Sequence, residues 1–119
     1  ANGFVRHQKQ IAASVKYNCI IVLKGAYTCI STPEGKSYFN PTGNAGLAKG
    51  GSGDVLTGII ASMLAQKYSP LQAAITGVYL HGLAADLATQ KIHQASLLAT
   101  DVIQNISKAF RYLQANDSK

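Results

Sequence analysis

The stretch from residue 40 to 66, NPTGNAGLAKGGSGDVLTGIIASMLAQ, contains the residue types that could carry chemistry. A glycine-rich loop that leads into a helix offers free backbone N–H groups and the positive end of the helix dipole, and both favour an anion such as phosphate. Gly50, Gly51 and Gly53 would let the backbone approach a ligand closely or adopt a positive φ. The pattern fits a phosphate-binding loop and, equally well, an ordinary flexible loop followed by a helix cap.

Asp54 is the carboxylate at the end of this loop. Beside phosphate-binding amides it would add repulsion, so its position needs a reason. A general base supplies one, because it could take the proton of a hydroxyl that attacks a terminal phosphoryl group while the loop amides neutralise the developing charge. The alternative is an aspartate that only caps the first amides of a helix.

Three helices are predicted after the loop. The first spans residues 54–67, and its apolar residues at helical spacing predict that nearly all of it is buried. Ser69 and Gln72 form a capping box in front of a second helix over 70–90, and Thr100 is expected to cap the third.

A helix, a strand and a hairpin are predicted before the loop. Residues 2–17 place Phe4, Ile11 and Val15 near one helical face, and CIIVLKG reads as a fully buried strand of a parallel sheet, from residue 19 to 23. A β-hairpin follows around the turn PEGK. A helix, a buried strand and further helices together indicate an α/β fold.

Composition excludes several classes of protein. A chain of 119 residues with 47% hydrophobic residues fits one domain. No membrane span or secretory signal is visible, so we expect a cytoplasmic protein. The net charge of +6 comes from scattered Lys and Arg, which argues against a nucleic-acid partner and for a small anionic ligand. Cys19 and Cys29 lie in apolar runs and are expected to be buried free thiols.

Three motifs resemble one known family. IVLKGAYTCI, GNAGLAKGGSGDVLTGIIASMLAQ and GVYLHGLAADLA, in this order, closely resemble the ADP- or ATP-dependent NAD(P)H-hydrate dehydratases of the ribokinase-like superfamily, which are related to carbohydrate kinases. The resemblance implies a three-layer α/β/α fold, of which residues 1–119 would be the C-terminal part of a single nucleotide-binding domain. It begins well inside the family domain, and the chain opens on Ala1 with Met63 as its only methionine, so we expect a piece of a longer protein.

The resemblance also implies an activity. Members of this family repair NADH and NADPH hydrated on the nicotinamide ring: ADP or ATP phosphorylates the ring hydroxyl, and loss of phosphate regenerates the reduced cofactor. Mg²⁺ is expected to accompany the nucleotide, although the scattered carboxylates define no metal site. The family points to a homo-oligomer, often a tetramer, and the chain would need the missing N-terminal half of the domain.

Carried over by motif, the resemblance assigns site residues. The turn expected to contact the nucleotide contains Lys24, Gly25, Ala26, Tyr27 and Thr28. The loop expected to surround the phosphates contains Asn44, Ala45, Gly46, Leu47, Ala48, Lys49, Gly50, Gly51, Ser52 and Gly53. Asp54 would face the hydrated nicotinamide as the base.

Other interpretations stay open. The same base and anion site would serve a ribokinase-like kinase acting on a sugar or a vitamin precursor, and a non-catalytic nucleotide-binding fragment fits as well. Lys49 could neutralise phosphate charge or point into water. His81, with Asp86 five positions later, is expected to be a partly buried, hydrogen-bonded histidine without a catalytic or metal role.

Overall fold

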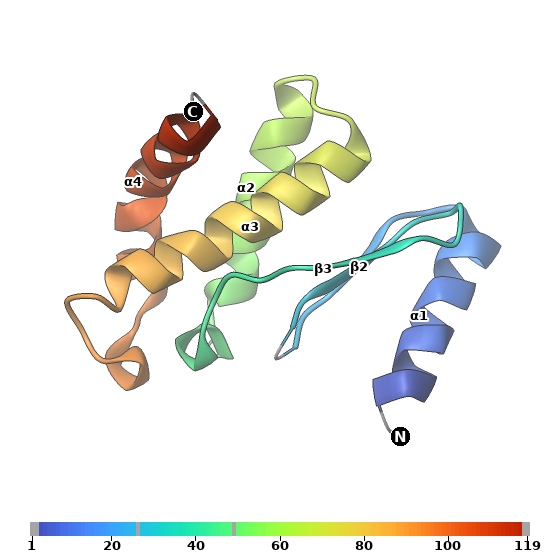
Figure 1. Ribbon diagram of the computed structural model, residues 1–119, viewed down its shortest axis with the longest axis horizontal. Helices are drawn as coiled ribbons and strands as arrows, with labels where there is room; N and C mark the ends of the chain where they lie inside the picture. Colours follow the sequence, from blue (N-terminus) through green and yellow to red (C-terminus); the bar gives the residue numbers. More distant parts are fainter. Residues whose placement is uncertain (1–2, 26, 49, 118–119) are drawn as a thin grey trace.

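The computed structural model describes residues 3–25, 27–48 and 50–117, and it shows three layers (Figure 1). Helix α1 covers one face of a small sheet, and the helices after the glycine-rich loop lie on the other side (Figure 1). The elements are α1 (Gly3–Tyr17), β1 (Ile21–Leu23), β2 (Cys29–Ser31), β3 (Ser37–Phe39), the short 3₁₀ helix η1 (Ala45–Ala48), α2 (Ser52–Ala65), α3 (Pro70–Ala88), the 3₁₀ helix η2 (Gln94–Ser96) and α4 (Ala99–Asp117). The predicted layered α/β class is confirmed.

The sheet is antiparallel in the order β1-β2-β3. The predicted hairpin forms because Pro33 presets its own φ, while Gly35 adopts a φ of 84° and donates its N–H to the Thr32 carbonyl. The prediction of a buried strand over residues 19–23 is only partly right. The strand begins at Ile21 rather than at residue 19, is half-buried, and pairs with β2 in an antiparallel sense. In the part of the chain that the structure describes, no strand pairs with the other edge of β1, so this strand lacks the cover that full burial requires.

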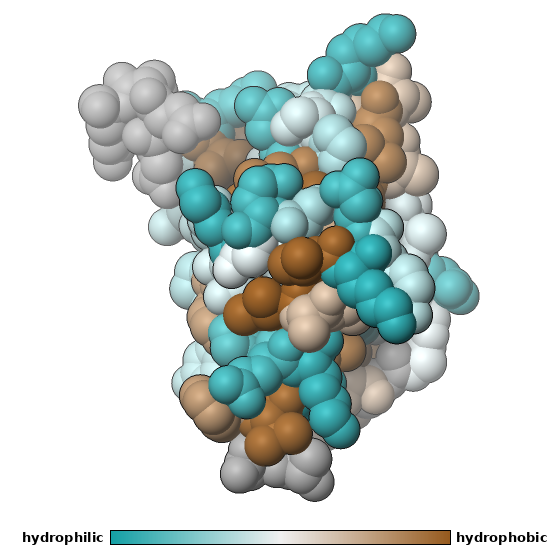
Figure 2. Space-filling model, turned by 90° about the vertical axis from the view of Figure 1, so that its right-hand side faces the viewer, coloured by the Kyte–Doolittle hydropathy of each residue, from teal (hydrophilic) through white to brown (hydrophobic). Residues whose placement is uncertain are grey.

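Helix α1 presents a different face to the sheet from the one that its apolar residues predict. Gln10 and Ser14 are its buried residues, whereas Phe4 and Val15 are 68% and 52% exposed. Gln10 reaches two carbonyls of the sheet through its Nε2. Hydrogen bonds therefore set the orientation of this helix, and the outer surface on the α1 side shows several separate apolar patches between hydrophilic side chains (Figure 2).

Helix α2 is less buried than its sequence predicts. It runs from Ser52 to Ala65, close to the expected range, but only Ser52, Leu56, Ile59 and Met63 are buried. Leu64 is 45% exposed because one side of α2 has no covering element among the described residues. The expectation that nearly all of this helix is buried is therefore wrong for the described residues.

Helix α3 is the centre of the core. Ser69 and Gln72 make the predicted capping box at its start. Gly77 permits close contact with α2, since a Cβ there would lie 2.8 Å from the Ile60 side chain. The buried residues of α3 are Ala73, Ala74, Gly77, Val78, Leu80, His81, Gly82, Leu83, Ala84, Ala85, Leu87 and Ala88.

The remaining expectations have mixed outcomes. Thr100 is not the cap of α4; instead the Asp101 carboxylate accepts a hydrogen bond from the Leu98 N–H in front of the helix. Cys29 is buried, as predicted, and burial raises the pKa of its thiol against a smaller lowering by a hydrogen bond from Gln10. The expected burial of Cys19 is wrong: this residue is exposed, two positions before β1 begins. None of the described helices is both long enough and apolar enough to cross a membrane.

Candidate functional site

The glycine-rich loop begins on the surface of α3, where three hydrogen bonds hold it. The Asp86 carboxylate accepts from the Gly43 N–H at 3.0 Å and from the Asn44 side-chain amide at 3.0 Å. The Thr42 hydroxyl donates to the Tyr79 carbonyl at 2.9 Å. Gly43 has a φ of 105°, which favours glycine at this corner. The start of the loop is therefore fixed to one side of α3.

Glycines let the loop lie directly against neighbouring backbone. A Cβ at Gly82 of α3 would contact the Thr42 hydroxyl and lie 2.7 Å from the Thr42 carbonyl carbon and 2.8 Å from the Gly43 nitrogen. A Cβ at Gly46 would lie 2.7 Å from the Gln94 carbonyl oxygen in η2. These distances leave no room for a side chain, so the first half of the loop is docked on the helical core.

The second half of the loop opens onto the N-terminus of α2. Gly51 precedes the helix with a φ of 89° and supplies no side-chain cap. The Val55 N–H bonds to the Gly51 carbonyl at 3.2 Å, and no side chain of the described residues caps the amides that precede it in the first turn. Gly50 and Gly53 are exposed, and Lys49 lies outside the described residues. Loop and helix thus offer uncapped N–H groups at the positive end of a helix dipole.

Asp54 lies in the first turn of α2 and is exposed. Its carboxylate makes no hydrogen bond or ion pair to another residue that the structure describes, and it does not cap the helix, since the residue at the cap position is Gly51. The carboxylate is therefore free to meet a ligand beside the uncapped amides.

The predicted nucleotide-contacting turn, residues 24–28, comes close to the loop at one point. The Lys24 ammonium donates to the Ser52 hydroxyl at 3.3 Å, and the Arg6 guanidinium donates to the Lys24 carbonyl at 3.1 Å. Tyr27 is 74% exposed, Gly25 is exposed and Thr28 is half-buried. Ala26 lies outside the described residues. The turn lines a pocket of about 230 Å³ that also contains Arg6.

His81 connects α3 to the end of the loop. Its side chain is 3% exposed, and its Nε2 lies 3.3 Å from the Ser52 hydroxyl oxygen. Burial first and the nearby Lys24 charge second lower the pKa of His81 to about 4, although a hydrogen bond with the Ser52 backbone opposes them. The imidazole is therefore neutral near pH 7. The prediction of a buried, hydrogen-bonded histidine is confirmed, but its partner is Ser52, whereas Asp86 bonds to the start of the loop.

Helix α3 supports both ends of the glycine-rich loop, a role that its own sequence does not reveal. His81 holds the end of the loop, Asp86 holds its start, and Gly82 lies against it between them. Gly82 and Asp86 stand four residues apart, the spacing of neighbours on one helical face. That spacing was the available signal, but nothing local shows that the loop lies on this face.

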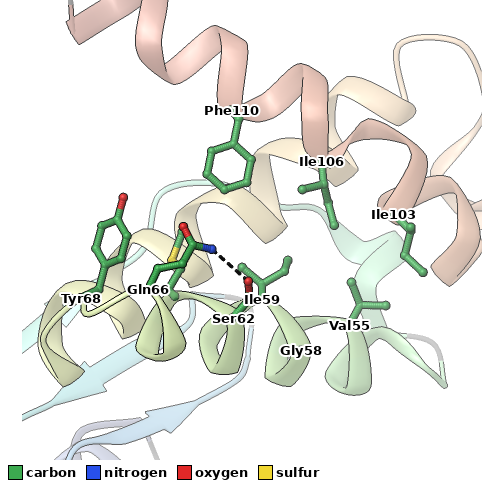
Figure 3. Close-up of a pocket in the computed structure, with 10 residues that line it drawn as sticks. Val55, Gly58, Ile59, Ser62, Gln66, Tyr68, Ile103, Ile106 and Phe110 are labelled. Atoms are coloured by element: carbon green, nitrogen blue, oxygen red, sulfur yellow. Dashed lines mark hydrogen bonds between the residues drawn. The ribbon is translucent and has the colours of Figure 1, made fainter.

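A larger pocket lies elsewhere, between α2 and α4. It measures about 350 Å³ (Figure 3). Val55 and Ile59 on α2 face Ile103, Ile106 and Phe110 on α4 across it. No charged residue lines this groove, so it does not suit a nucleotide phosphate. No group of three or more His, Cys, Asp or Glu residues in the described part of the chain could hold a metal ion.

A family model and the curated relatives of this chain point to the same family. The family model for NAD(P)H-hydrate dehydratase matches residues 4–108. The ADP-dependent (S)-NAD(P)H-hydrate dehydratase of Bacillus subtilis is 43% identical over 107 residues, which cover 87% of this chain and 38% of that protein. The bifunctional NAD(P)H-hydrate repair enzyme of Moorella thermoacetica is 44% identical over 99 residues, covering 83% of this chain and 19% of the relative. The chain thus spans well under half the length of these relatives.

Solved structures agree with the fold. The ADP/ATP-dependent NAD(P)H-hydrate dehydratase of Bacillus subtilis, co-crystallised with ATP and Mg²⁺, superposes with a TM-score of 0.85 at 38% identity, over 90% of this chain and 39% of that one. A ribokinase-like superfamily protein from Enterococcus faecalis gives a TM-score of 0.73 at 33% identity, over 93% of this chain and 37% of that one. The described architecture is therefore part of a ribokinase-like fold.

Proposed function

The chain belongs to the NAD(P)H-hydrate dehydratase family, and we propose that it supplies the nucleotide-binding and catalytic part of an enzyme that dehydrates hydrated NADH or NADPH with ADP or ATP. The observation that carries this proposal is the exposed Asp54 carboxylate beside the uncapped first turn of α2, at the end of a loop that α3 holds in place. A base and an anion site at one helix end suit attack of a hydroxyl on a phosphoryl group.

The proposed reaction assigns a role to each part. The terminal phosphoryl group of ADP or ATP lies against the loop of Asn44–Gly53, and the turn 24–28 contacts the rest of the nucleotide. Asp54 takes the proton of the ring hydroxyl as its oxygen attacks phosphorus. The bond between that phosphorus and the nucleotide's leaving oxygen breaks, and the loop amides neutralise the developing charge. The new phosphate then leaves the ring with the electrons of its C–O bond, and a proton is lost from the neighbouring ring carbon, which restores the double bond of NADH or NADPH.

Magnesium is part of the proposal as a companion of the nucleotide. Mg²⁺ prefers phosphate oxygens and water to an all-protein cage, and the described residues contain no cluster that would hold it alone. The ion would neutralise phosphate charge. Lys24 on the turn is the described cation that already reaches the start of α2.

We also propose that residues 1–119 form the C-terminal part of one ribokinase-like domain. The outer edge of β1 and the apolar side of α1 are the surfaces that further parts of that domain would cover. A homo-oligomer, a tetramer by family resemblance, and a cytoplasmic location complete the proposal.

Incubation of the complete protein with hydrated NADH and ADP or ATP, each with Mg²⁺, tests the function. The proposal predicts formation of NADH and release of phosphate, both dependent on the nucleotide. Phosphorylation of a sugar or vitamin-precursor alcohol without NADH formation would instead show the kinase alternative. Nucleotide binding with neither reaction would show a non-catalytic module.

A further inference from the structure

We propose that His81 is a positioning residue that, through the Ser52 hydroxyl, holds the Lys24 ammonium at the N-terminus of α2. The inference rests on the proposed function for its purpose, since Lys24 would meet the nucleotide there. It adds to that function a residue on α3 that touches no nucleotide and acts only through two other side chains.

The geometry joins the three motifs into one chain of contacts. Lys24 belongs to the turn after β1, Ser52 is the first residue of α2, and His81 lies in the middle of α3. The two links are each 3.3 Å, from the Lys24 nitrogen to the Ser52 oxygen and from that oxygen to His81 Nε2. Ser52 is 4% exposed and His81 is 3% exposed. The inner link is therefore shielded from water, while Lys24 itself is exposed.

Donor and acceptor chemistry allows both links at once. An ammonium only donates, so the Ser52 oxygen accepts from Lys24. A serine hydroxyl has one hydrogen and two acceptor sites, so Ser52 can also bond to the neutral His81 ring, by donating to Nε2 or by accepting from Nε2–H according to the tautomer. The lowered pKa of His81 agrees with this arrangement, since burial and the Lys24 charge both oppose a second cation here.

This arrangement removes freedom from a long side chain. A lysine on an exposed turn samples many rotamers, and ordering it when a ligand binds costs affinity. Anchoring Ser52 to the buried imidazole fixes the acceptor that Lys24 uses, so the charge is already directed at the end of the loop when an anion arrives. His81 thus contributes preorganisation rather than a contact with substrate.

Lysine reactivity in the ligand-free complete protein tests the positioning itself. Competitive labelling with an amine reagent measures Lys24 against the exposed Lys36 as internal reference. We expect His81→Leu and Ser52→Ala each to raise the relative reactivity of Lys24 several-fold, about what loss of one hydrogen bond to a charged group allows. His81→Gln, which keeps an amide acceptor, should restore most of the protection. Leu80→Val, in the buried part of the same helix, is the control for a general loss of packing in α3 and should leave the relative reactivity of Lys24 unchanged.

ADP affinity, measured by titration calorimetry on the same variants, tests whether the positioning of Lys24 serves nucleotide binding. His81→Leu should weaken ADP binding about ten-fold, the order expected for one charge-assisted hydrogen bond. In a Lys24→Met background the same substitution should change affinity by less than about two-fold, because the group through which it acts is gone.

The outcomes separate this inference from the proposed function. Unchanged Lys24 reactivity in His81→Leu and Ser52→Ala, or a full additional loss of ADP affinity in the Lys24→Met background, overturns the inference while leaving the enzyme assignment intact. Altered reactivity with no ADP binding by the unsubstituted protein supports the positioning and contradicts the proposed function.

Discussion

The two sides of the sheet are held by different kinds of contact. On the α1 side, the Gln10 amide donates to the carbonyls of Ile21 at 3.1 Å and Cys29 at 3.0 Å, and the Ser14 and Ser31 hydroxyls bond to each other. On the other side, Ile30 of the sheet packs with Leu56 of α2 and with buried side chains of α3. One interface depends on a few hydrogen bonds and the other on close apolar packing.

The difference explains where the chemistry lies. Groups that must be held within fractions of an ångström are best placed on rigid, well-packed elements. Helix α3 is such an element, and it carries both Asp86 and His81, which bind the two ends of the glycine-rich loop. Helix α1 leaves apolar residues exposed, and Arg6 links it to the predicted site through a hydrogen bond to the Lys24 carbonyl. The packed region should therefore control activity, and the region around α1 should respond mainly to what covers it.

The largest effect is expected at the base. Asp54→Asn in the complete protein should lower turnover by about 10² to 10⁴-fold, because the amide cannot accept the proton, while nucleotide affinity stays similar or rises as repulsion is removed. Steady-state kinetics and calorimetry measure the two quantities. Asp101→Asn is the matched control in the first turn of α4, where the carboxylate only accepts from the Leu98 N–H, and it should leave turnover unchanged. Full activity of Asp54→Asn would remove Asp54 from the chemistry.

The next effect tests the docking of the loop on α3. Gly82→Ala introduces a Cβ that must displace the backbone at Thr42 and Gly43, so it should cost about 1–3 kcal/mol of stability and weaken nucleotide binding. Gly58→Ala on α2 meets nothing within 4 Å and should stabilise the helix by up to about 1 kcal/mol without changing affinity. Denaturant unfolding and nucleotide titration compare the pair. Equal behaviour of the two variants would mean that the loop does not depend on its contact with α3.

A smaller effect is expected at Gly53, where a substitution should change ligand binding without changing stability. The structure assigns the positive φ values to Gly43 and Gly51, not to Gly53, and a Cβ at Gly53 meets nothing within 4 Å. Gly53→Val should therefore leave stability nearly unchanged but weaken nucleotide binding about ten-fold by blocking close approach to the amides. Gly58→Val, at an exposed position of the same helix, should leave nucleotide affinity unchanged. Unchanged affinity in Gly53→Val would remove this residue from the site.

A further effect, confined to acid pH, is a pH dependence of stability that arises from His81. Its folded pKa of about 4 lies below the unfolded value of 6.5, so the unfolded chain binds the proton more readily between these values. The part of the free energy of unfolding that comes from the neutral, buried His81 is therefore fully present above pH 6.5 and is lost progressively as the pH falls towards 4. Denaturant unfolding from pH 7 to 4 should show a steeper loss for the unsubstituted protein than for His81→Gln, which cannot titrate. Parallel curves would show that His81 is not held neutral by the fold.

Local signals were enough to predict the elements whose shape is set by adjacent residues. Ser69 and Gln72 predict the start of α3, and Pro33 and Gly35 predict the hairpin turn, because the interactions involved join residues no more than four positions apart. The inward face of α1 could not be predicted this way. Its orientation is set by Gln10, whose partners Ile21 and Cys29 lie 11 and 19 positions away.

The candidate site shows the same division. A glycine-rich loop ending in Asp54 is visible in the sequence, and the structure places it at the start of α2. The attachment to α3 is not visible, because Asp86 lies 43 positions from Gly43 and His81 lies 29 positions from Ser52. From the sequence, His81 was expected to be hydrogen-bonded, but its partner Ser52 could not be identified because nothing local places the loop on that helix.

Hydrogen exchange of the complete protein, with and without ADP and Mg²⁺, tests most directly whether the region held by α3 is the nucleotide site. We predict increased protection in the loop of residues 44–53 and the turn of residues 24–28, and no change in α1 or in the groove between α2 and α4. Protection confined to α1 or to that groove, with the loop unchanged, would contradict the account.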